Sequence, residues 1–107
     1  MLKLVAIEVE DTTIIKRFEC DFIAECDGSS IWSNTVGKKV HVTGITVIEE
    51  ENVDDEVVYI TVNVEHGSNW EIYTDRGFEA AISKELGFAV VFTEQGMQDN
   101  RCASMEA

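Results

Sequence analysis

The chain contains no proline, and only eight of its 107 residues are lysine or arginine, against 21 aspartates and glutamates. Without proline, its turns have to be formed by glycine, asparagine, aspartate and serine. The shortage of basic residues gives a formal net charge of −13, which repels nucleic acid and anionic membranes. We therefore expect no direct nucleic-acid binding and no membrane attachment, whereas a basic protein partner would be attracted.

Sequence motifs that carry chemistry are also missing. The chain has no glycine-rich phosphate-binding loop, no serine-centred nucleophile motif and no zinc-protease histidine pair. Its three cysteines, Cys20, Cys26 and Cys102, have no CxxC spacing. These absences predict a non-enzymatic protein without a cofactor. The cysteine pattern predicts free thiols in a reducing compartment, the cytoplasm.

The length and composition fit one folded domain. A chain of 107 residues has the size of a single domain, and 45% hydrophobic residues are enough for one core. The sequence becomes polar after Glu94. We therefore predict a single compact α+β domain over residues 1–96 and a flexible C-terminal tail or arm over residues 97–107.

Five segments of the chain have the pattern of β-strands. The clearest, 13–25 and 57–66, alternate apolar and polar residues, which is typical of a sheet with one face on a core and one in water. In segment 39–49 the alternation changes phase at Gly44, which predicts a β-bulge. The five predicted strands are residues 2–9, 13–25, 39–49, 57–66 and 70–74.

One segment has helical periodicity. Asp75 is in the position of an N-terminal cap, and Gly87 follows as the C-terminal stop. Residues 88–93 are apolar on both faces and predict a last strand in the interior of the sheet. The apolar stripe of the predicted helix consists of Phe78, Ala81, Ile82 and Leu86.

The predicted order of elements is thus βββββαβ. It indicates an α+β fold, a mainly antiparallel β-sheet of about six strands with one helix packed on one face. A small curled sheet or partial barrel is the alternative arrangement of the same elements. In either case the second face of the sheet is in water, where the polar residues of the alternating strands lie.

An acidic run after the third predicted strand is the first candidate site. Six carboxylates lie within eight residues with no basic residue among them. They form a solvated hairpin tip that discourages aggregation, or they bind a basic partner or a hard cation such as Ca²⁺. The spacing does not match an EF-hand loop. The candidate partner-binding carboxylates are Glu49, Glu50, Glu51, Asp54, Asp55 and Glu56.

Two aromatic residues complete the candidate binding surface. Trp32 lies in a polar loop, where it is either an interface anchor or a plug for the open end of the core. Tyr59 is on the outward phase of its strand. His41, on an outward phase, and His66, at a turn, are expected to be solvated and share no metal-ligand spacing.

Three functions agree with these features. The first is a non-enzymatic protein-interaction module that binds a protein partner or a second copy of the chain as a homodimer, favoured by the absence of catalytic motifs. The second is an acidic inhibitor of a basic nuclease or DNA-binding protein, acting as a nucleic-acid mimic or immunity-type protein, favoured by the net charge. The third is a small-ligand-binding domain or enzyme with a pocket between the helix and the sheet.

Overall fold

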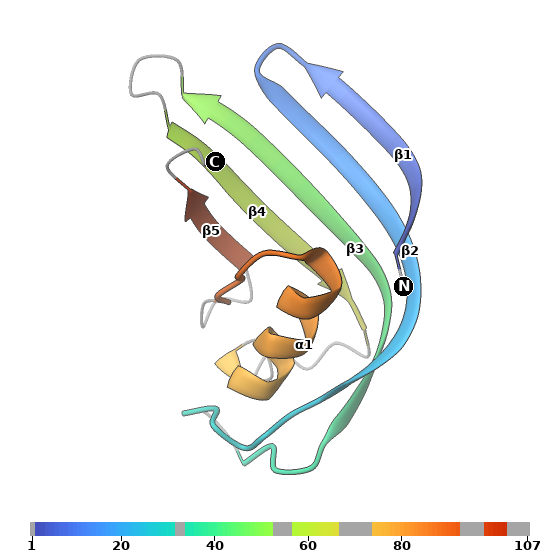
Figure 1. Ribbon diagram of the computed structural model, residues 1–107, viewed down its shortest axis with the longest axis vertical. Coiled ribbons are helices and arrows are strands. Elements are labelled where there is room, and N and C mark those ends of the chain that lie inside the picture. The colour runs from blue at the N-terminus through green and yellow to red at the C-terminus, as the bar shows by residue number, and fades with distance from the viewer. Residues whose placement is uncertain (1, 32–33, 53–56, 67–73, 93–97, 103–107) are drawn as a thin grey trace.

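The structure is one curved antiparallel sheet with a helix on its concave side (Figure 1). The computed structural model describes residues 2–31, 34–52, 57–66, 74–92 and 98–102. Its strands pair in the order β1-β2-β3-β4-β5, and the predicted α+β class with a mainly antiparallel sheet is confirmed. The elements are β1 (Lys3–Glu10), β2 (Thr13–Glu25), β3 (Lys39–Asn52), β4 (Val57–Glu65), α1 (Arg76–Leu86) and β5 (Gln98–Cys102).

The alternating pattern of β2 places its residues as predicted. Phe18, Phe22 and Ala24 face α1 and belong to the core or pack against it, whereas Arg17 and Glu19 are exposed on the convex face. Burial of the apolar row offsets the entropy of ordering the strand, and the polar row keeps its hydration. One face of β2 therefore packs against the core, and the other is exposed to solvent.

A bulge between β2 and β3 bends the sheet. The pairing register shifts between Glu19 and Phe22 of β2, opposite Gly44 and Val42 of β3. The buried phase of β3 changes at the same point, from Val42 to Ile45 on either side of Gly44. The predicted bulge is therefore confirmed, and bulges of this kind bend a strand and increase its local twist.

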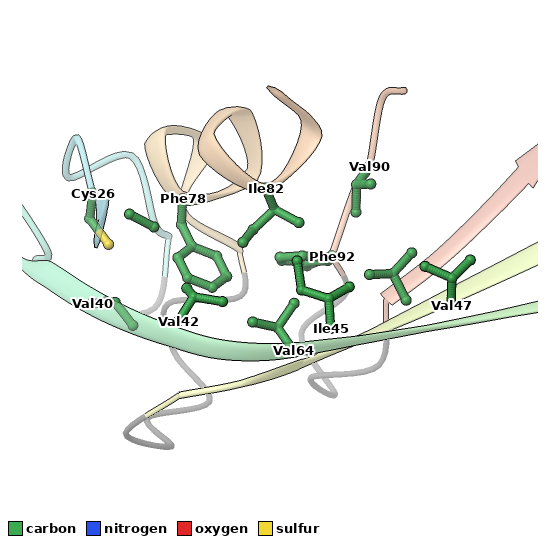
Figure 2. Packing of buried hydrophobic residues seen from close by; sticks show 12 residues of the cluster. Cys26, Val40, Val42, Ile45, Val47, Val64, Phe78, Ile82, Val90 and Phe92 are labelled. Carbon is green, nitrogen blue, oxygen red and sulfur yellow. The ribbon is translucent and has the colours of Figure 1, made fainter. Parts of the chain in front are cut away.

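The core lies between α1 and the concave face of the sheet. Figure 2 shows Phe78 and Ile82 pointing from α1 toward Val42 and Val64 on the strands. Both helix side chains are fully buried, which confirms the predicted apolar stripe. The buried cluster comprises Ala24, Cys26, Val40, Val42, Ile45, Val47, Val62, Val64, Phe78, Ile82, Val90 and Phe92.

The Asp75 carboxylate joins the helix to the loop that connects β2 with β3. As the predicted N-terminal cap it accepts a hydrogen bond from the amide of Phe78 at 3.0 Å. It also accepts one from each amide of Asp27 and Gly28, both at 3.0 Å, and one from the Thr35 hydroxyl. The Asp75 side chain is fully buried. One carboxylate thus provides the acceptor for four donors from two separate segments.

The first turn of α1 lies directly against the backbone of this loop. A Cβ atom built on Gly77 would be 2.7 Å from both the amide nitrogen of Asp27 and the carbonyl oxygen of Glu25. Such distances exclude any larger residue without a shift of the backbone. The Arg76 amide also donates to the Ser29 hydroxyl at 2.7 Å. Glycine at position 77 therefore allows the first turn of α1 to lie in direct contact with the loop backbone.

The predicted last strand is wrong in its described part, residues 88–92. No extended ladder forms there, only an isolated bridge at Phe92, and helix side chains accept the hydrogen bonds of two of its amides. The Val90 amide donates to the Ser83 hydroxyl and the Phe92 amide to the Glu79 carboxylate, both at 2.9 Å. The segment instead runs beside α1 and buries Val90 and Phe92 in the core.

Two further boundaries differ from the predictions. Strand β5, over residues 98–102, pairs antiparallel with β4 and was not predicted as a strand. Strand β3 extends to Asn52, so the first carboxylates of the acidic run belong to a strand. Residues 70–73 of the predicted fifth strand lie outside the described residues, and Thr74 is not in a strand.

Over the described ranges, no helix has the length and apolar character needed to cross a bilayer.

We predict that Asp75→Ala lowers the free energy of unfolding by about 3 kcal/mol or more. The substitution removes an N-cap, which alone costs about 1 kcal/mol, and leaves buried donors without their acceptor. Urea denaturation measures the change. The control is Asp27→Ala, since that exposed carboxylate accepts the nearby Ser29 amide, at 2.9 Å; we expect it to lower the free energy of unfolding by less than Asp75→Ala does. Equal losses for the two variants would contradict the assignment.

Candidate functional site

Strand β1 exposes an apolar surface that the fold does not cover. Its aliphatic side chains Leu4, Val5, Ile7 and Val9 are 46%, 48%, 53% and 66% exposed. Scattered exposed aliphatic residues are ordinary, but four within six positions of one strand form a continuous patch. We call these four residues the β1 surface.

The position of α1 explains this exposure. Strand β1 pairs with residues 13–19 of β2, and Figure 1 shows β1 at the edge of the sheet, to one side of α1. Its register places Leu4 opposite Phe18, which puts Leu4 on the concave face. The same face continues to Ile7 and Val9, which lie opposite Lys16 and Ile14 of β2. Leu4, Ile7 and Val9 of the β1 surface therefore extend the core face, and they remain 46%, 53% and 66% exposed.

A hollow of about 250 Å³ lies beside the β1 surface, since Phe18 and Lys16, which line it, pair with Leu4 and Ile7. It opens where the C-terminal end of α1 leaves the sheet. Its walls are formed by residues of the sheet, of α1 and of the segments next to them. The walls are apolar apart from one lysine and one glutamate. The lining residues are Leu2, Lys16, Phe18, Val47, Glu49, Leu86 and Phe88.

The two charged residues of the hollow form an ion pair. Lys16 of β2 and Glu49 of β3 approach to 3.7 Å, and about a third of each side chain remains exposed. A pair in contact with water stabilises the fold only slightly, by about 0–1 kcal/mol. Its effect is to neutralise both charges at the rim of an otherwise apolar surface. Lys16, which interrupts the apolar phase of β2 in the sequence, thus has a partner across the sheet.

The helix side of the hollow is held by Glu79. Its carboxylate accepts the Phe92 amide, and this contact fixes the segment that carries Phe88. Burial raises the pKa of the Glu79 carboxyl above its usual 4.5, because the charged form loses hydration. The hydrogen bond from Phe92 acts in the opposite direction and is the smaller effect.

The sequence-predicted carboxylates are distributed over two faces. Glu49 lies on the concave face beside Lys16, whereas Glu50 is exposed on the convex face opposite Tyr59 of β4. Glu51 is exposed near the end of β3. The remaining candidates, Asp54, Asp55, Glu56 and Trp32, lie outside the described residues. The structure brings Glu50 and Tyr59 together and separates both from Glu49.

The convex face carries most of the described acidic strand residues, but basic residues interrupt it. Glu8, Glu19 and Glu25 are exposed there, in register with Ile15, Lys3 and Lys39. Further exposed carboxylates on this face are those of Glu10, Asp21, Glu50 and Glu65. These charges do not form one uninterrupted row.

The described histidines and cysteines differ in burial. His41 is exposed as predicted, with Nε2 2.5 Å from the Asp21 carboxylate. His66 was expected to be solvated, but it is partly buried with its ring 5.7 Å from that of Phe78, and burial lowers its pKa. Burial raises the pKa of the Cys26 thiol to about 11, which keeps it protonated and unreactive.

Metal binding has no support in the part of the chain that the structure describes. No three His, Cys, Asp or Glu side chains gather there in a way that would hold an ion. Ile31, beside Trp32, is 81% exposed and so does not close the open end of the core. The signal for the β1 surface was present in the sequence, since the middle of segment 2–9 is apolar on both faces. That pattern usually indicates a buried strand.

Comparisons with protein-family models, curated proteins and solved structures gave no significant match to this chain. The function therefore has to be inferred from the geometry of the β1 surface, the hollow and the charged convex face.

We predict that Glu79→Gln changes the pH dependence of stability. A raised carboxyl pKa means that the folded protein holds the proton more tightly than the unfolded chain. This contribution is present below pH 4.5 and is lost as the pH rises through the folded-state pKa. The wild type should therefore lose stability relative to Glu79→Gln as the pH rises above 4.5, as measured by thermal unfolding. The exposed control Glu19→Gln should show a smaller change, and equal pH profiles for the two variants would contradict the burial effect.

Proposed function

We propose that this chain is a non-enzymatic protein-interaction module that binds its partner through the β1 surface. The observation that carries the proposal is the exposure of Leu4, Val5, Ile7 and Val9 on an edge strand. Burying apolar surface contributes about 25 cal/mol per Å², so covering this patch would supply a substantial driving force for association.

The location of the patch supports a protein as the ligand. An edge strand has backbone donors and acceptors on its free side, and another strand can pair with them. Among the described strands, β1 forms one edge of the sheet. Its charged residues Lys3, Glu8 and Glu10 alternate with aliphatic ones, which provides polar contacts beside apolar ones.

The hollow supports the same function. Its volume of about 250 Å³ is below the roughly 300–1,000 Å³ of typical small-molecule sites. It suits one or two apolar side chains of a protein partner, which would contact Phe18, Leu86 and Phe88. Inserted side chains of this kind form the centres of protein interfaces.

The charge distribution favours an apolar contact over nucleic-acid mimicry. A mimic requires carboxylates in a regular row, but Arg17 and Lys39 divide the carboxylates of the convex face, and Ile15 pairs with Ile48 between them. The net charge of −13 would still favour a basic partner at long range. We propose that the convex face attracts a basic partner at long range and keeps the chain soluble. The β1 surface then makes the direct contact with the partner.

We place the module in the cytoplasm. Cys20 and Cys26 are free thiols, and such thiols persist in a reducing compartment. Cys26 is buried and stays protonated, so it has a packing role beside the core.

We predict that the double variant Ile7→Thr/Val9→Thr weakens partner binding by about tenfold or more, because it removes apolar contacts at the centre of the surface. Threonine keeps the β-branched shape that strands favour, and both positions are exposed, so the fold should be retained. The measurement is affinity capture of the tagged chain from its native lysate at low and high salt, followed by titration of the captured protein against both variants.

Ile23→Thr is the matched control, since Ile23 is 56% exposed on the opposite face of the sheet. It should leave partner affinity unchanged. Binding that is lost at high salt and is insensitive to the β1 substitutions would instead support the acidic-inhibitor function.

A further inference from the structure

We propose that the β1 surface binds a second copy of this chain, with the two β1 strands paired antiparallel about a twofold axis between Val5 and Ala6. This inference rests on the proposed function and names the partner. It follows from the pattern of faces and charges along β1, which is complementary to itself in one register.

The faces of β1 are set by its pairing with β2. Lys3, Ala6 and Glu8 lie opposite Glu19, Arg17 and Ile15 on the convex face. Leu4, Ile7 and Val9 lie opposite Phe18, Lys16 and Ile14 on the concave face. The register shifts between Leu4 and Ala6, so Val5 is the extra residue of a bulge.

This bulge changes the phase of the strand. Before it, the odd-numbered Lys3 is convex; after it, the even-numbered Glu8 is convex. A residue before the bulge can therefore lie on the same face as the residue opposite it only if that residue of the partner strand comes after the bulge. The numbers of the two paired residues then add up to an odd number. Antiparallel self-pairing meets this condition along the whole strand when the two bulges lie side by side at the twofold axis.

In that register the pairs on either side of the bulge agree in face and in chemistry. Lys3 lies opposite Glu8 of the partner subunit on the convex face, and by symmetry the contact occurs twice. Leu4 lies opposite Ile7 of the partner subunit on the concave face. Opposite charges and aliphatic pairs at directly facing positions each stabilise a sheet.

Neighbouring registers lose this match. A shift that sets Lys3 opposite Glu10 of the partner subunit brings convex Ala6 against concave Ile7 of the partner subunit. A shift of one residue from the proposed register sets concave Leu4 against convex Glu8 of the partner subunit. The charge pattern thus selects one register from those that the edge could form.

The pairing also reaches the hollow. Val9 of the partner subunit falls opposite Leu2, which lines the hollow beside Phe18. The uncovered concave faces of the two copies would join into one apolar surface. Because a single edge strand buries less than the roughly 1,600 Å² of a standard interface, we expect a dissociation constant above about 1 μM.

Charge-reversal variants test the register. Glu8→Lys sets Lys3 against a lysine twice and should raise the dimer dissociation constant about tenfold, although it lowers the net negative charge of the chain. Lys3→Glu should weaken its own homodimer in the same way. When the two variants are mixed, both contacts become attractive, so the heterodimer should exceed the statistical half of all dimers in native mass spectrometry.

The control is Glu50→Lys, which makes the same charge change on an exposed convex position two strands away from β1. It should not weaken the homodimer, and it should show no preference for the Lys3→Glu chain. Sedimentation velocity of each variant gives the dissociation constants.

Zero-length carbodiimide coupling of wild-type chains tests the contact itself. In a mixture of ¹⁴N and ¹⁵N protein, a Lys3–Glu8 amide should join light to heavy chains. Lys3 and Glu19 face each other within one chain and provide the internal control for coupling.

A monomer at all concentrations up to about 200 μM, or a dimer without the Lys3–Glu8 link and without heterodimer preference, would overturn the proposed pairing. Either result leaves the proposed function to be decided by partner capture. The Ile7→Thr/Val9→Thr variant reports the loss of any other protein partner whether or not the chain pairs with itself.

Discussion

The Asp75 carboxylate is the interaction on which the rest of the structure depends. A helix of eleven residues is too short to be stable in water alone, so its position has to be fixed by contacts outside itself. Asp75 fixes it by accepting donors from its own first turn and from the amides of Asp27 and Gly28. A buried carboxylate is costly unless its oxygens are fully hydrogen-bonded, and this one has donors at both.

Anchoring α1 at this end of the sheet has a consequence for function. The helix is long enough to cover the region around Val42 and Val64, but it ends at Leu86 and leaves β1 beyond its reach (Figure 1). Glu79 and Ser83 then hold the following segment against the helix, so it does not cover β1 either. The exposure of the β1 surface thus follows from where α1 and residues 88–92 close the core.

Much of the fold could be predicted from periodicity, because residues 13–25 alternate, apart from an interruption at Lys16, and Asp75 precedes a helical stripe. The prediction of a strand over residues 88–93 was wrong because apolar composition does not reveal that helix side chains accept the amides of Val90 and Phe92. Strand β5 was missed because its residues are polar and its pairing is set by β4. The candidate site was missed for a related reason, since an apolar strand predicts burial and only the position of α1 shows that β1 is uncovered.

The most direct test of the anchoring role of Asp75 is amide hydrogen exchange followed residue by residue by NMR. If one carboxylate joins the loop to the helix, the amides of Asp27, Gly28 and Phe78 should open together and show closely similar free energies of opening. The account would be contradicted if the loop amides exchanged orders of magnitude faster than that of Phe78, since the loop would then open while the helix stayed in place.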